Sequence, residues 1–281
     1  MPSPRADLGV AVIDGSLYAV GGYFSVDALG TLEAYDPDSN SWTTKAAMPT
    51  PRIGVGVGVV NGILYAVGGS IPHVGNVATV EAYDPVSNSW TPKASMPTPR
   101  AYLAVGVVNG VLYAVGGLDG SLAQGGPVEA YDPVTNTWTT RARMPVARGF
   151  LGVGVISGTL YAVGSGVLEA YDPVADTWTT KAPMPTRRSA MGVGVVDGLL
   201  YTLGGVPTAG STSGFMNTVE VYDPTTNTWA RATSASMLTA RSEFGVGVLN
   251  NSLYAIGGYA PLSGNSYGFV ATNEVLQPNQ P

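Results

Sequence analysis

Residues 51–96 read PRIGVGVGVVNGILYAVGGSIPHVGNVATVEAYDPVSNSWTPKASM and contain one complete copy of a unit that recurs along the chain. The unit opens with Gly/Val alternation, turns at an Asn-Gly dipeptide and continues into the apolar run Leu-Tyr-Ala-Val. Asn-Gly accepts the positive φ angles of a two-residue hairpin turn, so these two runs are predicted to pair as antiparallel strands. A third strand is predicted before the Asp84-Pro85 turn and a fourth from Trp90 onwards.

Six copies of this unit follow one another. Each copy has an Arg thirteen residues before a Tyr, and successive tyrosines lie 47, 48, 48, 40 and 53 residues apart. The pairs are Arg5 and Tyr18, Arg52 and Tyr65, Arg100 and Tyr113, Arg148 and Tyr161, Arg188 and Tyr201, and Arg241 and Tyr254. This period predicts one small sheet per unit, stacked on its neighbours because a single sheet cannot bury both of its faces alone.

Two further features recur with the same period. A glycine pair follows the second strand in five of the six units, and a Tyr and a Trp stand seven residues apart in the first five. The aromatic pairs are Tyr35 and Trp42, Tyr83 and Trp90, Tyr131 and Trp138, Tyr171 and Trp178, and Tyr222 and Trp229. Together with the four apolar residues of the second strand, this pattern resembles the kelch repeat over nearly the whole chain.

The resemblance implies an all-β fold: a six-bladed kelch β-propeller whose four-stranded antiparallel blades surround a central channel. We expect one domain over residues 1–281, with repeats at approximately 1–47, 48–95, 96–143, 144–183, 184–236 and 237–281. Each unit also holds one such Arg and one Glu at its own recurring position in the repeat, which favours a structural ion pair in every blade. These acids are Glu33, Glu81, Glu129, Glu169, Glu220 and Glu274.

Unit six departs from the pattern, because neither an Asp-Pro turn nor a Trp follows Leu276. The four residues before Arg5 are too few to supply the absent strand. Blade six is therefore predicted to be three-stranded, or else the chain is a fragment of a longer repeat protein; the likeness of residues 1–5 to the joints between units favours a cut inside a repeat array. We expect a monomer, with dimerisation through the open edge of blade six as the alternative.

Composition argues against several classes of function. The net charge is −6 and Lys and Arg do not cluster, so we expect no nucleic-acid partner. The chain has no Cys and one His, which excludes thiolate chemistry and the copper site of galactose-oxidase-like kelch enzymes. We expect no cofactor, no metal and no membrane partner, since no long apolar run and no export signal occur. The compartment stays open.

Residues outside the repeat pattern are the candidates for function. Strand direction places the joints before the first strands, and the connections between second and third strands, on one rim, which we call the upper face. Nine non-repeated aromatic residues map to it: Phe24, Phe150, Phe215, Phe244, Phe269, Tyr23, Tyr102, Tyr259 and Tyr267. From these, the non-repeated acids and the polar joint residues we predict a ligand site of Asp7, Tyr23, Phe24, His73, Tyr102, Asp119, Phe150, Ser189, Phe215, Ser242, Glu243 and Tyr259, and we assign no catalytic residue.

The family resemblance gives a second approach to the same face. In kelch domains that serve as ubiquitin-ligase adaptors, the two residues after the joint Arg line the channel mouth where a peptide binds. The matching positions here are Ala6 and Asp7, Ile53 and Gly54, Ala101 and Tyr102, Gly149 and Phe150, Ser189 and Ala190, and Ser242 and Glu243. None is the Arg that such adaptors present to acidic peptides, so a basic peptide or a neutral sugar fits better.

Loop lengths suggest where the upper face opens. The connection from the glycine position to the third-strand Tyr spans 6 residues in unit four and 13 to 18 residues in the others. We therefore expect a groove over blade four, walled by loops 206–218 and 259–273.

Two hypotheses about function remain. The first is a non-catalytic module that binds a peptide or protein at an aromatic, mildly acidic upper face. The alternative is a carbohydrate-binding protein, or a sugar isomerase resembling the kelch-type sialic acid mutarotases. In that case Tyr102 and Phe150 would stack on a pyranose while Asp7 and Glu243 bind hydroxyls or act as acid and base. Whether the chain is an enzyme is left open, with the non-catalytic reading preferred.

Overall fold

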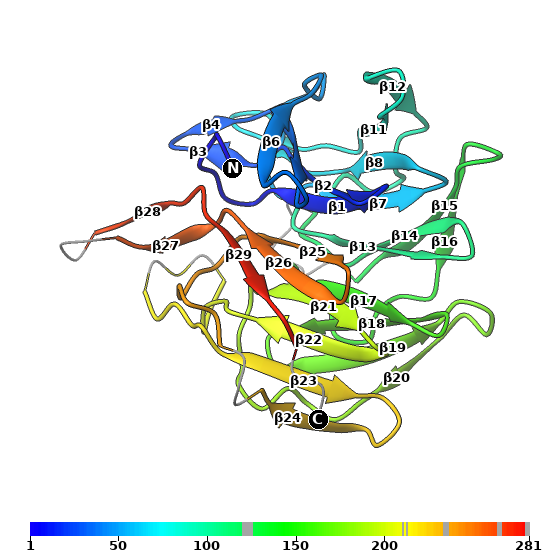
Figure 1. The fold of residues 1–281 in the computed structure, drawn as a ribbon. Helices are drawn as coiled ribbons and strands as arrows, with labels where there is room; N and C mark the ends of the chain where they lie inside the picture. The colour runs from blue at the N-terminus through cyan, green and yellow to red at the C-terminus, as the bar shows by residue number, and fades with distance from the viewer. Residues whose placement is uncertain (120–125, 210, 212, 233–235, 263–265, 279–281) are drawn as a thin grey trace.

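Six antiparallel sheets are arranged as blades around a central channel in the computed structural model (Figure 1). The structure describes residues 1–119, 126–209, 211, 213–232, 236–262 and 266–278. Within them, five blades have four strands and the sixth has three. The predicted all-β, six-bladed kelch propeller is confirmed, and the described residues of blade six form a three-stranded sheet.

The strands of each blade are given from the channel outward. Blade one has β1 (Gly9–Ile13), β2 (Ser16–Val20), β5 (Leu32–Asp36) and β6 (Ser41–Thr44); blade two has β7 (Gly56–Val60), β8 (Ile63–Val67), β11 (Val80–Asp84) and β12 (Ser89–Lys93); blade three has β13 (Ala104–Val108), β14 (Val111–Val115), β15 (Val128–Asp132) and β16 (Thr137–Arg141).

The second half of the ring follows the same order. Blade four has β17 (Gly152–Ile156), β18 (Thr159–Gly164), β19 (Val167–Asp172) and β20 (Thr177–Thr180); blade five has β21 (Gly192–Val196), β22 (Leu199–Leu203), β23 (Val219–Asp223) and β24 (Thr228–Arg231); blade six has β25 (Gly245–Leu249), β26 (Ser252–Ile256) and β29 (Asn273–Leu276). Three short hairpins lie on the upper face: β3 (Tyr23–Phe24) with β4 (Asp27–Ala28), β9 (Ser70–Ile71) with β10 (Gly75–Asn76), and β27 (Tyr259–Pro261) with β28 (Tyr267–Phe269).

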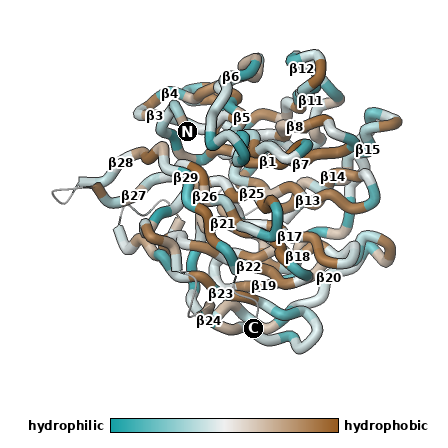
Figure 2. The backbone as a smooth tube through the Cα atoms, viewed as in Figure 1, coloured by the Kyte–Doolittle hydropathy of each residue, from teal (hydrophilic) through white to brown (hydrophobic). Residues whose placement is uncertain are grey.

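The Gly/Val alternation of the first strands lets neighbouring blades approach closely. A Cβ added to Gly58 in β7 would lie 2.7 Å from Leu112 Cδ2 in blade three, which is too close for any side chain. The valines between these glycines pack in the same seams, and Figure 2 shows the hydrophobic strands stacked side by side through the ring. The repeat pattern therefore alternates small and large residues rather than polar and apolar ones.

Each blade buries one Arg–Glu ion pair, as the recurrence of one Arg and one Glu in every unit predicted. In blade one, Arg5 Nη1 donates to Glu33 Oε2 across 2.6 Å, and Arg5 Nη2 donates to the Ala19 carbonyl at 3.0 Å. The guanidinium thus ties the joint to the second and third strands of the blade. Removing one partner of such a pair leaves the other charge buried without compensation.

The Tyr–Trp pairs connect consecutive blades. In blade two the rings of Tyr83 and Trp90 lie 5.2 Å apart, and Tyr83 also lies 6.0 Å from Tyr18 of blade one. Trp90 Nε1 donates to the Ala46 carbonyl of blade one at 2.8 Å. The aromatic residues therefore supply both apolar area and one directed hydrogen bond at each such seam.

The ring closes between blades six and one although blade six has three strands. A Cβ on Gly245 of β25 would lie 2.1 Å from Val10 Cγ2 of β1, so these first strands pack as tightly as those of the other seams. The N-terminal ammonium of Met1 donates to the Ala271 carbonyl at 2.8 Å, in the position that Met48 N takes on the Gly30 carbonyl of blade one. No helix able to span a membrane occurs in the described part of the chain.

Candidate functional site

Six joint residues form a closed ring around the channel. The second residue after each joint Arg has a positive φ: Asp7 51°, Gly54 60°, Tyr102 56°, Phe150 52°, Ala190 52° and Glu243 59°. The N–H of each donates to the carbonyl of its counterpart in the preceding blade, over distances from 2.8 to 3.1 Å. A non-glycine residue in this backbone region carries a strain of about 1–3 kcal/mol, which the hydrogen-bonded ring must hold in place. Six residues, one from each blade, thereby line one space, and all except Gly54 carry a side chain.

Below this ring the channel is apolar. The next residue in each joint lines the same hollow of about 110 Å³: Leu8, Val55, Leu103, Leu151, Met191 and Phe244. Phe244 was expected to stand outside the repeat, but it fills the position of these aliphatic residues and is buried between blades five and six. It belongs to the core, because its ring takes the space that Gly192 and Gly204 leave beside it.

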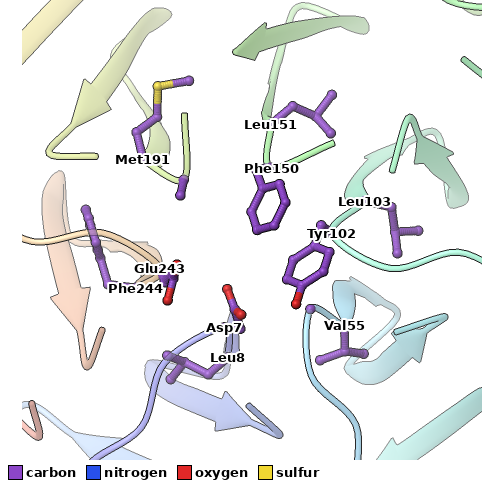
Figure 3. A pocket seen from close by; sticks show the side chains of 12 residues that line it. Asp7, Leu8, Val55, Tyr102, Leu103, Phe150, Leu151, Met191, Glu243 and Phe244 are labelled. Atoms are coloured by element: carbon purple, nitrogen blue, oxygen red, sulfur yellow. The ribbon is translucent and has the colours of Figure 1, made fainter. Parts of the chain in front are cut away.

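Asp7 and Glu243 bring two carboxyl groups into the mouth of the channel. Figure 3 shows both groups on the same side of the channel as the Tyr102 hydroxyl. Burial raises the pKa of Asp7 well above its ordinary value, and the neighbouring Glu243 raises it further. Burial also raises the pKa of Glu243, although the Tyr23 hydroxyl donates to Glu243 Oε2 at 3.3 Å. The ion pairs of the described residues are the six Arg–Glu pairs of the blades, and neither acid takes part in one.

Two phenols face this acidic pair. Burial, followed by the charges of Glu243 and Asp7, raises the pKa of Tyr23. Burial and the same two acids raise the pKa of Tyr102. Both hydroxyls therefore keep their protons at neutral pH, and that of Tyr23 donates to Glu243.

Tyr102 is held edge-on to the channel. Its ring stacks on Phe150, with centroids 4.0 Å apart and planes inclined by 22°. A Cβ added to Gly54 would lie 2.8 Å from Tyr102 Cδ1, so the Tyr102 ring also lies close to the Gly54 backbone. Phe150 covers one face of the Tyr102 ring, and Gly54 has no side chain that would displace it.

A wider aromatic vestibule lies above the ring of joint residues. This second hollow, of about 520 Å³, shares Asp7, Tyr102, Phe150 and Glu243 with the channel and adds Tyr23, Ser25, Ile53, Ser211, Tyr259 and Phe269. Phe269 is central to it, since its ring lies 5.0 Å from Tyr23, 5.2 Å from Phe24 and 5.3 Å from Tyr259. The vestibule presents ring faces and edges directly above the two acids.

The structure brings together six of the twelve predicted site residues around the channel and vestibule: Asp7, Tyr23, Tyr102, Phe150, Glu243 and Tyr259. Phe24 and Phe215 stand beside them, in ring contact with Phe269 and Tyr259 respectively. The other four predicted residues lie elsewhere.

Ser189 and Ser242 are buried rather than displayed. Each forms an isolated β-bridge, Ser189 with Val206 and Ser242 with Tyr259, and neither lines the channel. The same bridge forms at Ala6, Ile53 and Ala101, so the first residue after the joint Arg has a structural role. Of these bridge residues, only Ile53 lines the vestibule. The second residue after each joint Arg lines the channel.

His73 and Asp119 also stand apart from the site. His73 is exposed and lines a separate hollow with residues such as Asp27 and Pro51 on the outer part of the upper face. Asp119 follows the bridge residue Leu118; burial lowers the pKa of Arg100, and the charges of Glu129 and Asp119 oppose this lowering. Neither residue is among those that line the channel or the vestibule.

The hollows at the channel mouth open along the axis, whereas a groove was expected over blade four. The hollow is lined from all six blades, and the two long loops contribute Ser211, Tyr259 and Phe269 to its wall. Parts of loops 206–218 and 259–273 lie outside the described residues. The short blade-four connection is a turn at Ser165-Gly166, and of that blade only Phe150 lines the vestibule.

Sequence reasoning missed Phe269 and the two serines, Ser25 and Ser211, as members of the vestibule. Phe269 carried a signal, because it is one of the aromatic residues outside the repeat pattern. The serines carried none. No group of three or more His, Cys, Asp or Glu side chains that could hold a metal is found among the residues that the structure describes.

Comparison with known proteins identifies the repeat. The family model described as Kelch motif matches residues 4–49, 51–97, 99–145 and 187–236. A solved structure entitled "Structure of YjhT" is similar with a TM-score of 0.81 and 18% sequence identity, covering 98% of this chain and 95% of that chain. At this identity the likeness concerns the fold.

Proposed function

Because this chain belongs to the kelch-repeat family, whose motif matches more than half of its length, we propose that it is a non-catalytic binding module that takes a basic segment of a peptide or protein into its channel mouth. One observation carries the proposal: Asp7 and Glu243 face the same hollow without a basic partner among the described residues.

The electrostatics of the free site favour a cation. Two carboxyl groups that are desolvated and close to each other cannot both ionise without cost, which is why their pKa values are raised. An ammonium or guanidinium group between them would remove that cost and gain charge-assisted hydrogen bonds. The gain is larger in a partly buried hollow than at an open surface, because water screens the charges less there.

The aromatic vestibule supports the same ligand class. Cations bind over ring faces, with contributions from about 0.5 kcal/mol at exposed sites to about 2 kcal/mol where water is excluded. Phe269 and Tyr23 lie above the acids, and Tyr259 extends the aromatic wall. A lysine or arginine side chain would enter the channel with its charge, while the flanking peptide rests on these rings.

The carbohydrate alternative has less support from the geometry. Its stacking platform was to include Tyr102 and Phe150, but these two rings stack on each other with centroids 4.0 Å apart, so each has one face covered by the other. A neutral sugar would also leave the two acids without a counter-charge. The sugar alternative is therefore kept as an outcome of the test below.

The test is a calorimetric titration of the protein with three ligands: a short lysine-rich peptide, a glutamate-rich peptide of equal length, and a set of neutral and acidic monosaccharides. We expect binding of the first alone. Glu243→Gln should weaken it by at least about tenfold, because one charge-assisted contact is lost. Asp38→Asn removes an equal charge from the exposed turn between β5 and β6 and should leave the affinity unchanged. Sugar binding without peptide binding would overturn the proposal.

A further inference from the structure

Two aromatic residues of the vestibule are anchored by the same joints that carry the acids. The first residue after a joint Arg forms a β-bridge with the residue that follows the glycine pair, as Ala6 does with Tyr23 and Ser242 with Tyr259. In both joints the N–H of the tyrosine donates to the carbonyl of its bridge partner at 2.9 Å. The next residue in each of these joints is one of the two channel acids. Each acid is thus one residue away from a backbone contact that anchors a tyrosine.

The bridge position is not aromatic at the other joints where the described residues form this bridge. Those bridges pair Ile53 with Ser70, Ala101 with Leu118, and Ser189 with Val206. None of these three joints carries an acid at the position after the bridge residue. Because the other units show what the scaffold requires there, the coincidence of a tyrosine and an acid in blades six and one points to a common use of the two residues.

Phe269 connects the two anchored tyrosines. It lies directly opposite Tyr259 in the hairpin of β27 and β28, which runs beside the hairpin of β3 and β4 (Figure 1). Its ring plane is inclined by 77° to that of Tyr259 and by 88° to that of Tyr23. The three rings therefore form adjoining walls of the vestibule instead of one stack. The Tyr23 hydroxyl donates to Glu243 Oε2, which joins one wall to the acids below.

We propose that the vestibule binds the trimethylammonium group of a methylated lysine side chain. The inference rests on the proposed function and names the cation that the same site prefers. A quaternary ammonium group has no N–H and is stabilised by ring faces together with negative charge nearby. A primary ammonium group is strongly hydrated and has three donors that need partners when it leaves water. Aromatic walls above two acids suit the first group better than the second.

The two hollows suit different head groups. The channel below the six joint residues has a volume of about 110 Å³, and the vestibule above them has about 520 Å³. An unmethylated lysine passes the rings and donates to Asp7 or Glu243, as the proposed function has it. A trimethylammonium group has no hydrogen to donate, so it gains most by staying among the three rings, with the acids as counter-charge.

The experiment titrates the full chain by calorimetry with short peptides that differ only at one central lysine. We expect the trimethylated form to bind at least about tenfold more tightly than the unmethylated form. A third peptide carries the uncharged tert-butyl group, which has the shape of trimethylammonium. It should bind about tenfold or more weakly than the trimethylated peptide, because only the charge is lost.

Two variants of Phe269 test the aromatic wall. Phe269→Leu keeps an apolar side chain but removes the ring, and it should abolish most of the preference for the trimethylated peptide. Phe269→Tyr keeps the ring and should keep the preference. Phe215→Leu is the matched control: the Phe215 ring contacts Tyr259 at 6.0 Å but does not line the vestibule, so the preference should stay unaltered.

The outcomes separate this inference from the proposed function. Equal binding of the unmethylated and trimethylated peptides, or tighter binding of the unmethylated one, would overturn the inference and leave the proposed function in place. Binding of neither peptide would overturn both. Equal binding of the tert-butyl and trimethylated peptides would overturn the inference as well, because the hollow would then recognise shape without charge.

Discussion

The backbone N–H of Asp7 donates to the carbonyl of Glu243 across 2.8 Å, and this contact joins the first blade to the last. It closes a ring of six hydrogen bonds in which every donor and acceptor belongs to a residue with positive φ. The same contact places the only two acidic members of the ring next to each other. Ring closure and the acidic mouth therefore have one structural origin.

Asp7→Asn is expected to stabilise the protein at neutral pH. The folded-state pKa of Asp7 is raised, so the folded protein binds a proton more tightly than the unfolded chain does, and stability falls as pH rises from the unfolded pKa of about 4. Asn removes this cost above that pH and changes nothing below it. Denaturant unfolding from pH 3 to pH 8 should show a variant that gains stability only above about pH 4. A gain of the same size at all pH values would mean that the charge is not its cause.

Glu81→Gln is expected to destabilise the fold by about 3–5 kcal/mol, because the guanidinium of Arg52 would stay buried without a charged partner. The free energy of unfolding from urea titration measures this. Asp38→Asn, at an exposed turn, is the control and should change stability by less than about 0.5 kcal/mol. Equal small effects of both variants would show that the buried pair contributes little.

The two tryptophans Trp90 and Trp42 should respond differently to replacement by Phe. Trp90→Phe removes a hydrogen bond to the Ala46 carbonyl and leaves that carbonyl unpaired, which should cost about 1–2 kcal/mol. Trp42→Phe removes an N–H that has no partner among the described residues and should cost clearly less. The measurement is the difference between their midpoints of denaturant unfolding. Equal losses of stability would contradict the view that Trp90 donates a hydrogen bond to the preceding blade whereas Trp42 does not.

The architecture could be predicted from the sequence because the same unit occurs six times in it. An error in one unit matters little when the same hairpin turn and glycine pair return in its neighbours. The ion pairs were predictable for the same reason: counterparts of Arg52 and Glu81 occur in every unit, whereas a single Arg and Glu would have given no such signal.

The site was harder to predict, because sequence gives the rim on which a residue lies but not the direction of its side chain. Ser242 and Glu243 are adjacent, yet the first turns inward to bridge Tyr259 and the second faces the channel. His73 and Phe24 were assigned to the correct rim, but they stand at different distances from the axis. Phe244 was counted as a residue outside the repeat because the other units have an aliphatic residue or Met at this position. It nevertheless takes the same place in the core as those residues.

Proton release on ligand binding tests the central claim most directly. The account holds that a cation enters between Asp7 and Glu243 and lowers their raised pKa values, so binding must expel a proton where the pair is partly protonated in the free protein. Titrating the lysine-rich peptide by calorimetry in two buffers of different ionisation enthalpy counts these protons. The account predicts proton release over the pH range in which the pair is partly protonated in the free protein, weaker binding below that range, and less release from Glu243→Gln. Binding of the peptide without proton release, with the same affinity for the wild type and Glu243→Gln at every pH, would contradict it.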